Sequence, residues 1–422
     1  MIRYILAIVL LAPNIVSGQQ SSHNGAPKFA PEDGKKLIIV GQDLGAVGGL
    51  NTYTDGYVDY IMGIPAGVTT YTSIPSLSGL KSMVNYGSGD VHAGAYLVDN
   101  TFDNSAIVIG LYIVNQLDNI NSGNTDESIV DLANWIKNAA RPVFLRIGYE
   151  FDGPWNGYDP EKFKAAWIYI VKKFDANEVR NVAFVWQSAG INTANIERWY
   201  PGDQYVNWLA YSHFDGPNPG QSIRNFANLH NKPIMIAEAT PRVDLKDGSG
   251  DTYWENWYSP LFSSIYANDK IKALAYINAN WDSQSMWNGQ GWGDSRIQVN
   301  EAVKTKWEAE LAGDNWIFGD ESLFDKMEFQ KWQDSIYVYS IPANVENELL
   351  YFQNSDGIVF RSKNHENIDA LNLFDIAGKV IYQSSGKSSE YTLLVNNLLP
   401  NSVLFARAII AGKSLSFKIL LD

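Results

Sequence analysis

The sequence predicts an α/β fold, namely a (β/α)₈ TIM barrel followed by a small all-β domain. From residue 36 onwards, short β-rich apolar runs alternate with longer amphipathic segments, which is typical of βα units around a parallel sheet. Eight such units fit in the 36–315 stretch, the usual size of a TIM barrel. A doubly wound open sheet is the alternative, but no Gly-rich phosphate-binding motif follows the first strand.

Eight barrel strands are predicted in order, with two candidates for the second. They are 36–40, 58–62 or 93–98, 106–112, 142–146, 182–186, 208–211, 233–237 and 273–277. Helices are expected between them, among them 127–138 and 160–174, where Asp159 suits the N-cap and Pro160 the first turn. The segment 299–311 is the expected closing helix.

After residue 330 the pattern changes to short alternating strands, which predicts a β-sandwich-like domain over 330–422. Turn residues between 313 and 330 mark the boundary. The predicted strands are 335–339, 349–352, 357–360, 370–374, 379–382 and 402–406.

The N-terminus has the features of a secretory signal peptide over residues 1–18. One positive charge precedes a short apolar run, and Val16-Ser17-Gly18 suits cleavage. The run is too short to span a bilayer. A buried N-terminal helix is the alternative. The signal peptide implies a mature protein that is secreted or attached to the cell surface.

Composition excludes several classes of function. The net charge of −14 argues against nucleic acid, whose phosphates require clustered Lys and Arg. The absence of Cys removes thiolate sites, and the five His show no metal-ligand spacing, so neither a metal nor another cofactor is expected. The 14 Trp and 23 Tyr favour core packing in part and stacking on sugar rings in part. We expect a monomer.

Two acidic residues directly follow predicted strands. Glu150 follows the fourth strand and Glu238 the seventh. Reactive groups of TIM barrels lie at the C-terminal ends of strands, and glycoside hydrolysis requires two carboxyl groups with opposite protonation. The sequence therefore predicts Glu150 as general acid/base and Glu238 as nucleophile of a retaining hydrolase.

Arg146 lies four residues before Glu150, so strand alternation places both on the inward face. There the cation can favour an ionised nucleophile, or it can form a buried structural ion pair.

These motifs resemble glycoside hydrolase family 26, which includes β-mannanases and β-1,3-xylanases. The resemblance spans residues 36–312 and rests on Arg146-Ile-Gly-Tyr-Glu150 with Trp155, on residues 41–43, 200–207 and 293–298, and on Trp186 and Trp281 at strand ends. It implies endo-cleavage of a β-linked polysaccharide such as β-mannan, β-1,3-xylan or a related glycan. The polysaccharide is the expected partner.

Two positions depart from the family pattern. The residue before the acid/base is usually His in the family and is Tyr149 here. The family's strand-six Tyr, which hydrogen-bonds the nucleophile, falls near Tyr211 and His213, so that a Phe or His can occupy its place. Stacking on sugar is predicted for five rings, Trp155, Trp186, Trp281, Trp287 and Trp292, with core packing the alternative for Trp186.

The tail from about Asp369 to the C-terminus resembles C-terminal sorting domains of the type IX secretion system, which implies contact with outer-membrane secretion machinery. A carbohydrate-binding β-sandwich and a merely stabilising module are the alternatives for this domain. For the whole chain, the alternative function is a secreted, non-catalytic polysaccharide-binding protein on a TIM-barrel scaffold.

Overall fold

The structure is a computed structural model that describes residues 25–215, 219–329, 349–354, 357–362, 366–374, 379–384, 386–394 and 403–420. The chain divides into two compact units, Met1–Lys331 and Trp332–Asp422. The expected signal peptide and the predicted strand 335–339 lie outside the described residues. No helix in the described ranges has the length and apolarity needed to cross a bilayer.

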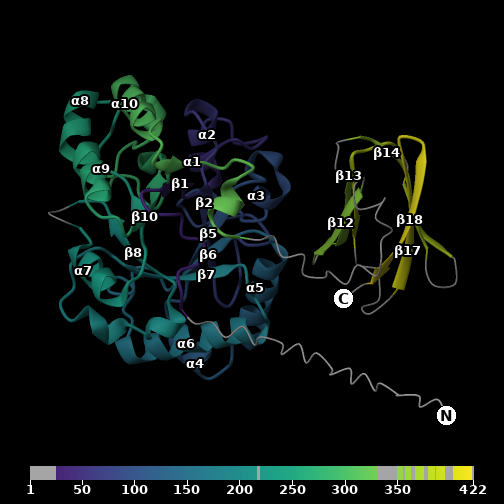
Figure 1. The fold of residues 1–422 in the computed structure, drawn as a ribbon, viewed down its shortest axis with the longest axis horizontal. Coiled ribbons are helices and arrows are strands. Elements are labelled where there is room, and N and C mark those ends of the chain that lie inside the picture. The colour runs from purple at the N-terminus through teal and green to yellow at the C-terminus, as the bar shows by residue number, and fades with distance from the viewer. Residues whose placement is uncertain are drawn as a thin grey trace, which may run out of the picture. The chain divides into compact units, whose positions relative to one another are not determined.

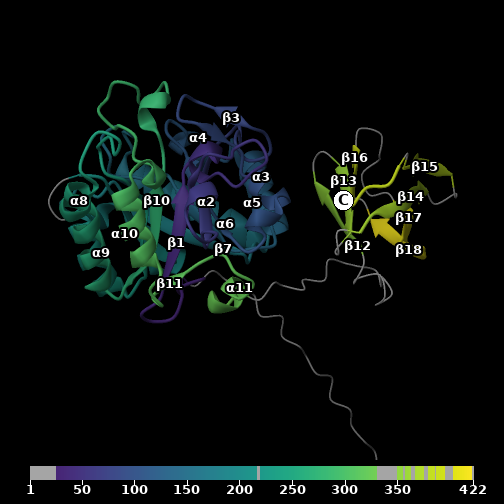
Figure 2. The ribbon, with the colours of Figure 1, turned by 90° about the horizontal axis from the view of Figure 1, so that it is seen from above.

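The first unit is a closed barrel of eight parallel strands (Figures 1 and 2). Neighbours follow chain order, and β10 pairs with β1 to close the barrel, with Leu37 opposite Ala273. The strands are β1 Lys36–Gly41, β2 Gly67–Ser73, β5 Ala106–Tyr112, β6 Val143–Ile147, β7 Val182–Ser188, β8 Trp208–His213, β9 Ile234–Ala239 and β10 Ile271–Ile277. The predicted (β/α)₈ fold is confirmed.

The prediction for the second strand was wrong. Neither 58–62 nor 93–98 forms a strand, because these segments contain the short helices α2 Tyr57–Tyr60 and α3 Ala95–Val98. The second strand is β2, whose sequence GVTTYTS is rich in β-branched residues but polar. Its inward positions carry Thr69 and Tyr71 rather than apolar side chains, so the apolar pattern of a buried strand is missing.

Helices surround the barrel (Figure 1). The N-cap Asp159 accepts hydrogen bonds from the backbone amides of Glu161 and Lys162, as expected. Beyond α2 and α3, the helices are α1 Leu44–Val47, α4 Leu117–Asn121, α5 Asp126–Asn138, α6 Pro160–Ala176, α7 Gln221–His230, α8 Gly250–Tyr253, the π-helical turn η4 Trp254–Tyr258, α9 Ser259–Tyr266, α10 Glu301–Leu311 and α11 Leu323–Lys326. Short 3₁₀ turns are η1 Asn100–Phe102, η2 Ile196–Trp199, η3 Asp203–Tyr205, η5 Trp281–Ser283 and η6 Ile297–Val299.

Alternation along the strands separates two cores. One cluster fills the barrel with alanines such as Ala183, Ala210 and Ala273 together with large side chains such as Phe144 and Trp208, and the other packs between the strands and the helices. Phe29, Phe324 and Phe329 belong to the inner cluster, and β11 Trp316–Ile317 pairs with the first residues of β1. The N-terminal end of the barrel is therefore closed by chain, which leaves the C-terminal ends of the strands as the open mouth.

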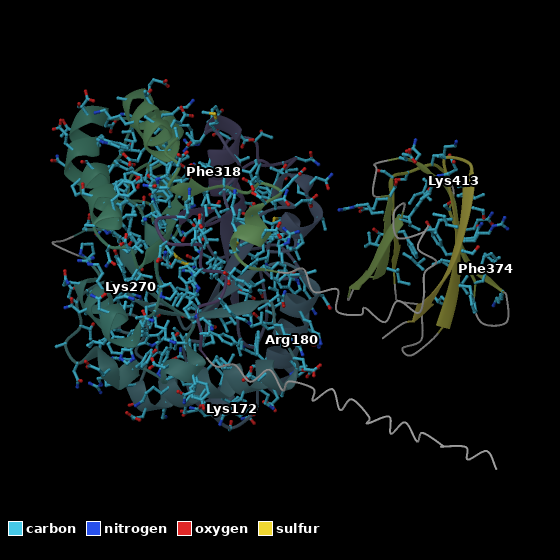
Figure 3. All side chains as sticks on the ribbon, in the orientation of Figure 1. Lys172, Arg180, Lys270, Phe318, Phe374 and Lys413 are labelled. Carbon is cyan, nitrogen blue, oxygen red and sulfur yellow. The ribbon has the colours of Figure 1, made fainter. Side chains whose placement is uncertain are left out.

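The second unit consists of two antiparallel sheets, ordered β12-β13-β16 and β15-β14-β17-β18. Both sheets contribute to one core, which includes Leu349, Ile358, Leu371 and Leu404. Figure 3 labels Phe374 and Lys413, two residues of the larger sheet. The strands are β12 Leu349–Asn354, β13 Gly357–Ser362, β14 Ile368–Phe374, β15 Val380–Gln383, β16 Glu390–Leu394, β17 Val403–Ile410 and β18 Lys413–Leu420. Strands β16 and β18 were not among those predicted. The small hairpin β3 Val84–Asn85 and β4 Asp90–Val91 belongs to the first unit.

Candidate active site

Glu150 lies in a strained turn at the C-terminal end of β6. Its φ is 54°, in the left-handed region that a non-glycine residue rarely adopts. The side-chain amide of Asn156 donates to the carbonyls of Tyr149 and Glu150, at 3.1 and 2.8 Å, and the amide of Gly153 donates to the Glu150 carbonyl at 2.8 Å. Strain of this kind persists where the surroundings enforce it, often at functional sites.

The Glu150 carboxyl is buried and accepts two hydrogen bonds. Ser212 Oγ donates to Oε1 at 2.6 Å, and Trp155 Nε1 donates to Oε2 at 3.1 Å. Burial raises the pKa of Glu150 to about 8, and the charge of Glu238 adds to this shift. Both causes disfavour the ionised form, so this carboxyl carries its proton at neutral pH.

Glu238 points into the barrel because of a bulge in β9. Met235 and Ala237 face the interior, while Ile236 and Ala239 face the helices, so strict alternation would turn residue 238 outward. The pairing with both neighbouring strands shifts at this point, as Tyr211 lies opposite Ile236 but Ser212 opposite Glu238. Bulges near active sites re-aim side chains in this way.

Arg146 and Tyr71 bind the Glu238 carboxylate. Arg146 Nη1 lies 2.6 Å from Oε1 in an ion pair, and the Tyr71 hydroxyl donates to the same oxygen at 3.1 Å. The Arg146 guanidinium is fully buried and lies 5.1 Å from the Tyr71 ring centroid. Gly110 makes room for both, because a Cβ there would lie 2.5 Å from the Tyr71 ring.

Arg146 thus contacts the predicted nucleophile and not the acid/base. It faces inward from β6 as predicted, but Glu150 reaches the site through the turn after Ile147 and not by alternation along the strand. Tyr71 was missed because it lies on the strand that the sequence did not reveal.

A hydrogen-bonded chain connects the two carboxyl groups. Gln187 Nε2 donates to Ser212 Oγ at 3.1 Å and lies 3.5 Å from Glu238 Oε1, while its Oε1 accepts from Arg146 at 2.9 Å. Because Ser212 donates to Glu150, the two acids meet at one site at the barrel mouth. Gln187 and Ser212 are inward residues of β7 and β8, and no motif in the sequence marks them.

The comparisons with known proteins agree with this geometry. The model of glycosyl hydrolase family 26 matches residues 82–279, which include both acids. A β-1,3-xylanase of a Vibrio species is 32% identical over 330 residues, covering 71% of this chain and 69% of that protein. The chain belongs to glycosyl hydrolase family 26. A β-1,3-xylanase of an Alcaligenes species is 31% identical over 336 residues, covering 73% and 70%.

Solved structures support the fold of this family-26 glycoside hydrolase. The catalytic domain of a Bacillus sp. JAMB-750 endo-β-1,4-mannanase of the family superposes with a TM-score of 0.51 at 16% identity, covering 74% of this chain and 98% of that domain. The described residues contain no group of three or more His, Asp or Glu side chains placed to hold a metal ion.

Several aromatic residues of the enzyme lie at the mouth. Trp155 is 61% exposed. Tyr149 is half-buried, and its ring centroid lies 5.4 Å from Arg146 Cζ. Trp281 is buried beneath the half-buried Trp287 and Trp292, at 5.5 and 4.9 Å between ring centroids. Trp155, Trp287 and Trp292 are therefore placed to present ring surface, whereas Trp281 supports them.

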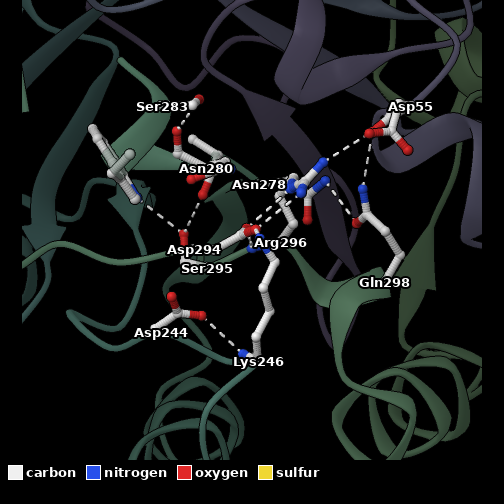
Figure 4. Close-up of polar contacts among 12 residues, drawn as sticks. Asp55, Asp244, Lys246, Asn278, Asn280, Ser283, Asp294, Ser295, Arg296 and Gln298 are labelled. Carbon is white, nitrogen blue, oxygen red and sulfur yellow. Dashed lines mark hydrogen bonds and ion pairs between the residues drawn. The ribbon is translucent and has the colours of Figure 1, made fainter. Parts of the chain in front are cut away.

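An ion-pair network anchors the loop that carries Trp287 and Trp292 (Figure 4). Buried Asp294 pairs with Arg296 at 2.9 Å and with Lys246 at 2.6 Å, and Arg296 reaches Asp55 at 2.9 Å. These contacts join the loop after β10 to the loops after β9 and β1.

Two residues of the family-26 enzyme that the sequence marks as site candidates, Trp186 and Tyr211, do not face the mouth. Trp186 and Tyr211 are fully buried on the outward face of β7 and β8, because residues 187 and 212 occupy the inward positions. Trp186 stacks on Phe151 at 4.2 Å, so the stacking prediction was wrong and core packing is correct. Neither ring has surface to offer a sugar.

His213 is half-buried at the end of β8, 5.4 Å from the Trp257 ring, and no contact joins it to either acid. Burial, with the charge of Arg224, lowers its pKa to about 4, so it is neutral. Tyr71, from β2, occupies the role beside the nucleophile that the sequence assigned to the Tyr211 and His213 region.

Proposed function

We propose that the enzyme cleaves its glycan with retention of configuration, by a double displacement in which Glu150 is the acid/base and Glu238 the nucleophile. The observation that carries this proposal is the contrast between the two carboxyl groups. Glu150 is protonated through burial, with a pKa of about 8, whereas Glu238 is ion-paired with Arg146. Two carboxyl groups in such different environments are what glycoside hydrolysis requires.

In the first step, a Glu238 oxygen bonds to the anomeric carbon while the glycosidic bond breaks and Glu150 gives its proton to the leaving oxygen. Bonding to the sugar removes the negative charge of Glu238, which is one cause of the raised pKa of Glu150. The pKa of Glu150 therefore falls when it must act as base. It then takes a proton from the water that attacks the anomeric carbon and releases Glu238.

For substrate, β-1,3-xylan is the first choice, because the two relatives that cover most of the chain are named β-1,3-xylanases. β-Mannan and related β-glycans follow, with endo-cleavage in each case. The half-buried Tyr149 beside Tyr71 shapes the space next to the acids. New reducing ends from a panel of β-1,3-xylan, β-mannan and β-glucans test this choice, and equal or greater activity on mannan would overturn it.

The assignment of the nucleophile is tested with Glu238→Ala. Turnover should fall by several orders of magnitude, and azide should restore it with a glycosyl azide of inverted configuration, because azide fills the space of the lost carboxylate. Glu150→Ala should lose least in kcat/KM on substrates with activated leaving groups, whose departure needs no proton, while kcat falls because the base of the second step is missing. A Glu238→Ala enzyme with normal activity on polysaccharide would contradict the assignment.

We further propose that the enzyme acts outside the cytoplasm as a monomer, exported by the signal peptide at residues 1–18 and by the C-terminal domain at 330–422. The support is the sequence pattern of both ends. Deletion of 330–422 in a host with type IX secretion should keep the enzyme from the medium and the cell surface. Unchanged export would contradict a sorting role, and light scattering of the purified protein tests the monomer.

A further inference from the structure

A polar pocket of about 350 Å³ lies where the segments that follow β1 and β10 meet the loop of β3 and β4. Asp43 comes two residues after β1, and Ser283 and Gln284 follow β10, the strand that pairs with β1. We call this site the polar pocket. The polar side chains that line it include those of Asp43, Tyr53, Asn85, Asp90, Ser283 and Gln284.

The side chains of the polar pocket are held in place by one another. Asp43 Oδ1 accepts from the Ala46 amide at 3.0 Å, and its Oδ2 accepts from Gln284 Nε2 at 3.1 Å. Asp90 accepts from the Tyr53 hydroxyl at 2.9 Å and from the Asn85 amide at 2.7 Å. A preorganised polar wall of this kind binds a ligand with little ordering cost.

A buried polar atom on the wall of the polar pocket, Gln284 Oε1, has no hydrogen-bond partner. An unsatisfied buried polar group costs about 1–3 kcal/mol. Such groups in a cavity indicate a hydrogen-bonding ligand or water.

Glycines allow the walls of the polar pocket to approach one another closely. Gly89, at φ 92°, lies so close to Asp43 that a Cβ would be 2.3 Å from its Cγ. Gly87, at φ 93°, approaches Ser285 in the same way, at 2.7 Å from Oγ. The loop of β3 and β4 can therefore approach the end of β1 only because these positions lack side chains.

The polar pocket is connected to the catalytic pair. Gln42 Oε1, from the neighbour of Asp43, lies 3.0 Å from the Tyr71 hydroxyl, which is also 3.1 Å from Glu238 Oε1 and shares its proton between these two acceptors. A glycan held at the two acids can thus extend along the mouth to the ends of β1 and β10. The residues that line the polar pocket include two carboxylates and neither Lys nor Arg, so they suit the hydroxyls of an uncharged sugar and repel sulfate or uronate.

We propose that the polar pocket is a subsite that binds an uncharged sugar unit of the substrate, away from the cleaved bond, through hydroxyl groups donated to Asp43 and Asp90. This proposal rests on the proposed function. It predicts that the enzyme prefers oligosaccharides long enough to reach the pocket, and that the preference depends on Asp90 and Tyr53.

The test compares kcat/KM of the full chain for β-1,3-xylo-oligosaccharides of increasing length, or for those of whichever β-glycan it hydrolyses. Asp90→Asn and Tyr53→Phe should lower kcat/KM for the longest substrates about tenfold, since a hydrogen bond to a charged group is lost. They should change it less than twofold for the shortest substrate cleaved. The control Asp131→Asn, on the exposed side of α5, should change neither.

Three results would overturn the subsite. The first is an unchanged kcat/KM for long oligosaccharides in both variants. The second is an equal loss of kcat/KM at every oligosaccharide length, which indicates a structural role. The third is the same loss in the control Asp131→Asn. A wild-type chain that hydrolyses no β-glycan contradicts the proposed function instead. In that case the subsite is tested by calorimetric measurement of the binding of β-1,3-xylohexaose. About tenfold weaker binding to Asp90→Asn than to wild type supports the subsite, and unchanged binding contradicts it.

Discussion

Replacing Glu150 by Gln should stabilise the enzyme, and the gain should increase with pH. Gln has the shape of the protonated acid, so the variant removes the cost of burying a charge at this site. The pKa of Glu150 is about 8 in the folded enzyme, against a reference of 4.5. A carboxyl whose pKa is raised by folding stabilises the folded state fully at pH values below its unfolded pKa. This stabilisation is lost as pH rises through its folded pKa.

The magnitude follows from the size of this shift. Each pKa unit is equivalent to about 1.4 kcal/mol, so ionised Glu150 destabilises the folded enzyme by about 5 kcal/mol above pH 8. One contact opposes the gain, because the Gln amide cannot accept from Trp155 Nε1 as the carboxylate Oε2 does. That loss is about 1 kcal/mol and does not depend on pH. The net effect of the substitution is therefore a gain of about 4 kcal/mol at pH 9 and a loss of about 1 kcal/mol near pH 4, where only the lost Trp155 contact remains.

Thermal unfolding of wild type and Glu150→Gln between pH 4 and pH 9 measures this difference. A gain of about 4 kcal/mol should raise Tm by about 8 °C at pH 9. Glu197→Gln, at an exposed position, is the matched control and should show no trend with pH. A Tm difference between wild type and Glu150→Gln that stays constant over this range would refute the raised pKa.

Three further predictions concern the neighbours of the acids. Tyr71→Phe should remain folded but lose about tenfold in kcat, because Glu238 loses a charged hydrogen bond, measured by steady-state kinetics. Ser212→Ala should move the basic limb of the pH profile of kcat/KM upward, because the Ser212 hydrogen bond lowers the pKa of Glu150; a downward shift contradicts this. Trp186→Phe should lower Tm yet leave KM within twofold, whereas a raised KM would restore a binding role.

Periodicity predicted most of the fold because most barrel strands are apolar on both faces. It failed at β2, where Thr69, Thr70 and Tyr71 break the apolar run that marks a strand buried on both sides. That failure also concealed Tyr71, so the missing partner of the nucleophile and the missing strand have the same cause.

Both acids were predicted because each follows an apolar run, but their geometry was not. The bulge that turns Glu238 inward and the left-handed turn at Glu150 arise from tertiary contacts and leave no periodic signal. Alternation could have corrected Trp186, since the polar Gln187 next to it marks the inward face of β7. The polar pocket joins segments more than 190 residues apart, which a single sequence does not reveal.

Trapping the covalent intermediate tests the central claim most directly. A 2-fluoro glycoside of the substrate sugar with a good leaving group should inactivate the enzyme, because fluorine slows release of the glycosyl group from the nucleophile. Peptide mapping by mass spectrometry should then find the added sugar on Glu238. An adduct on another residue, or rapid hydrolysis of the natural glycan with inverted product and no adduct, would contradict the account.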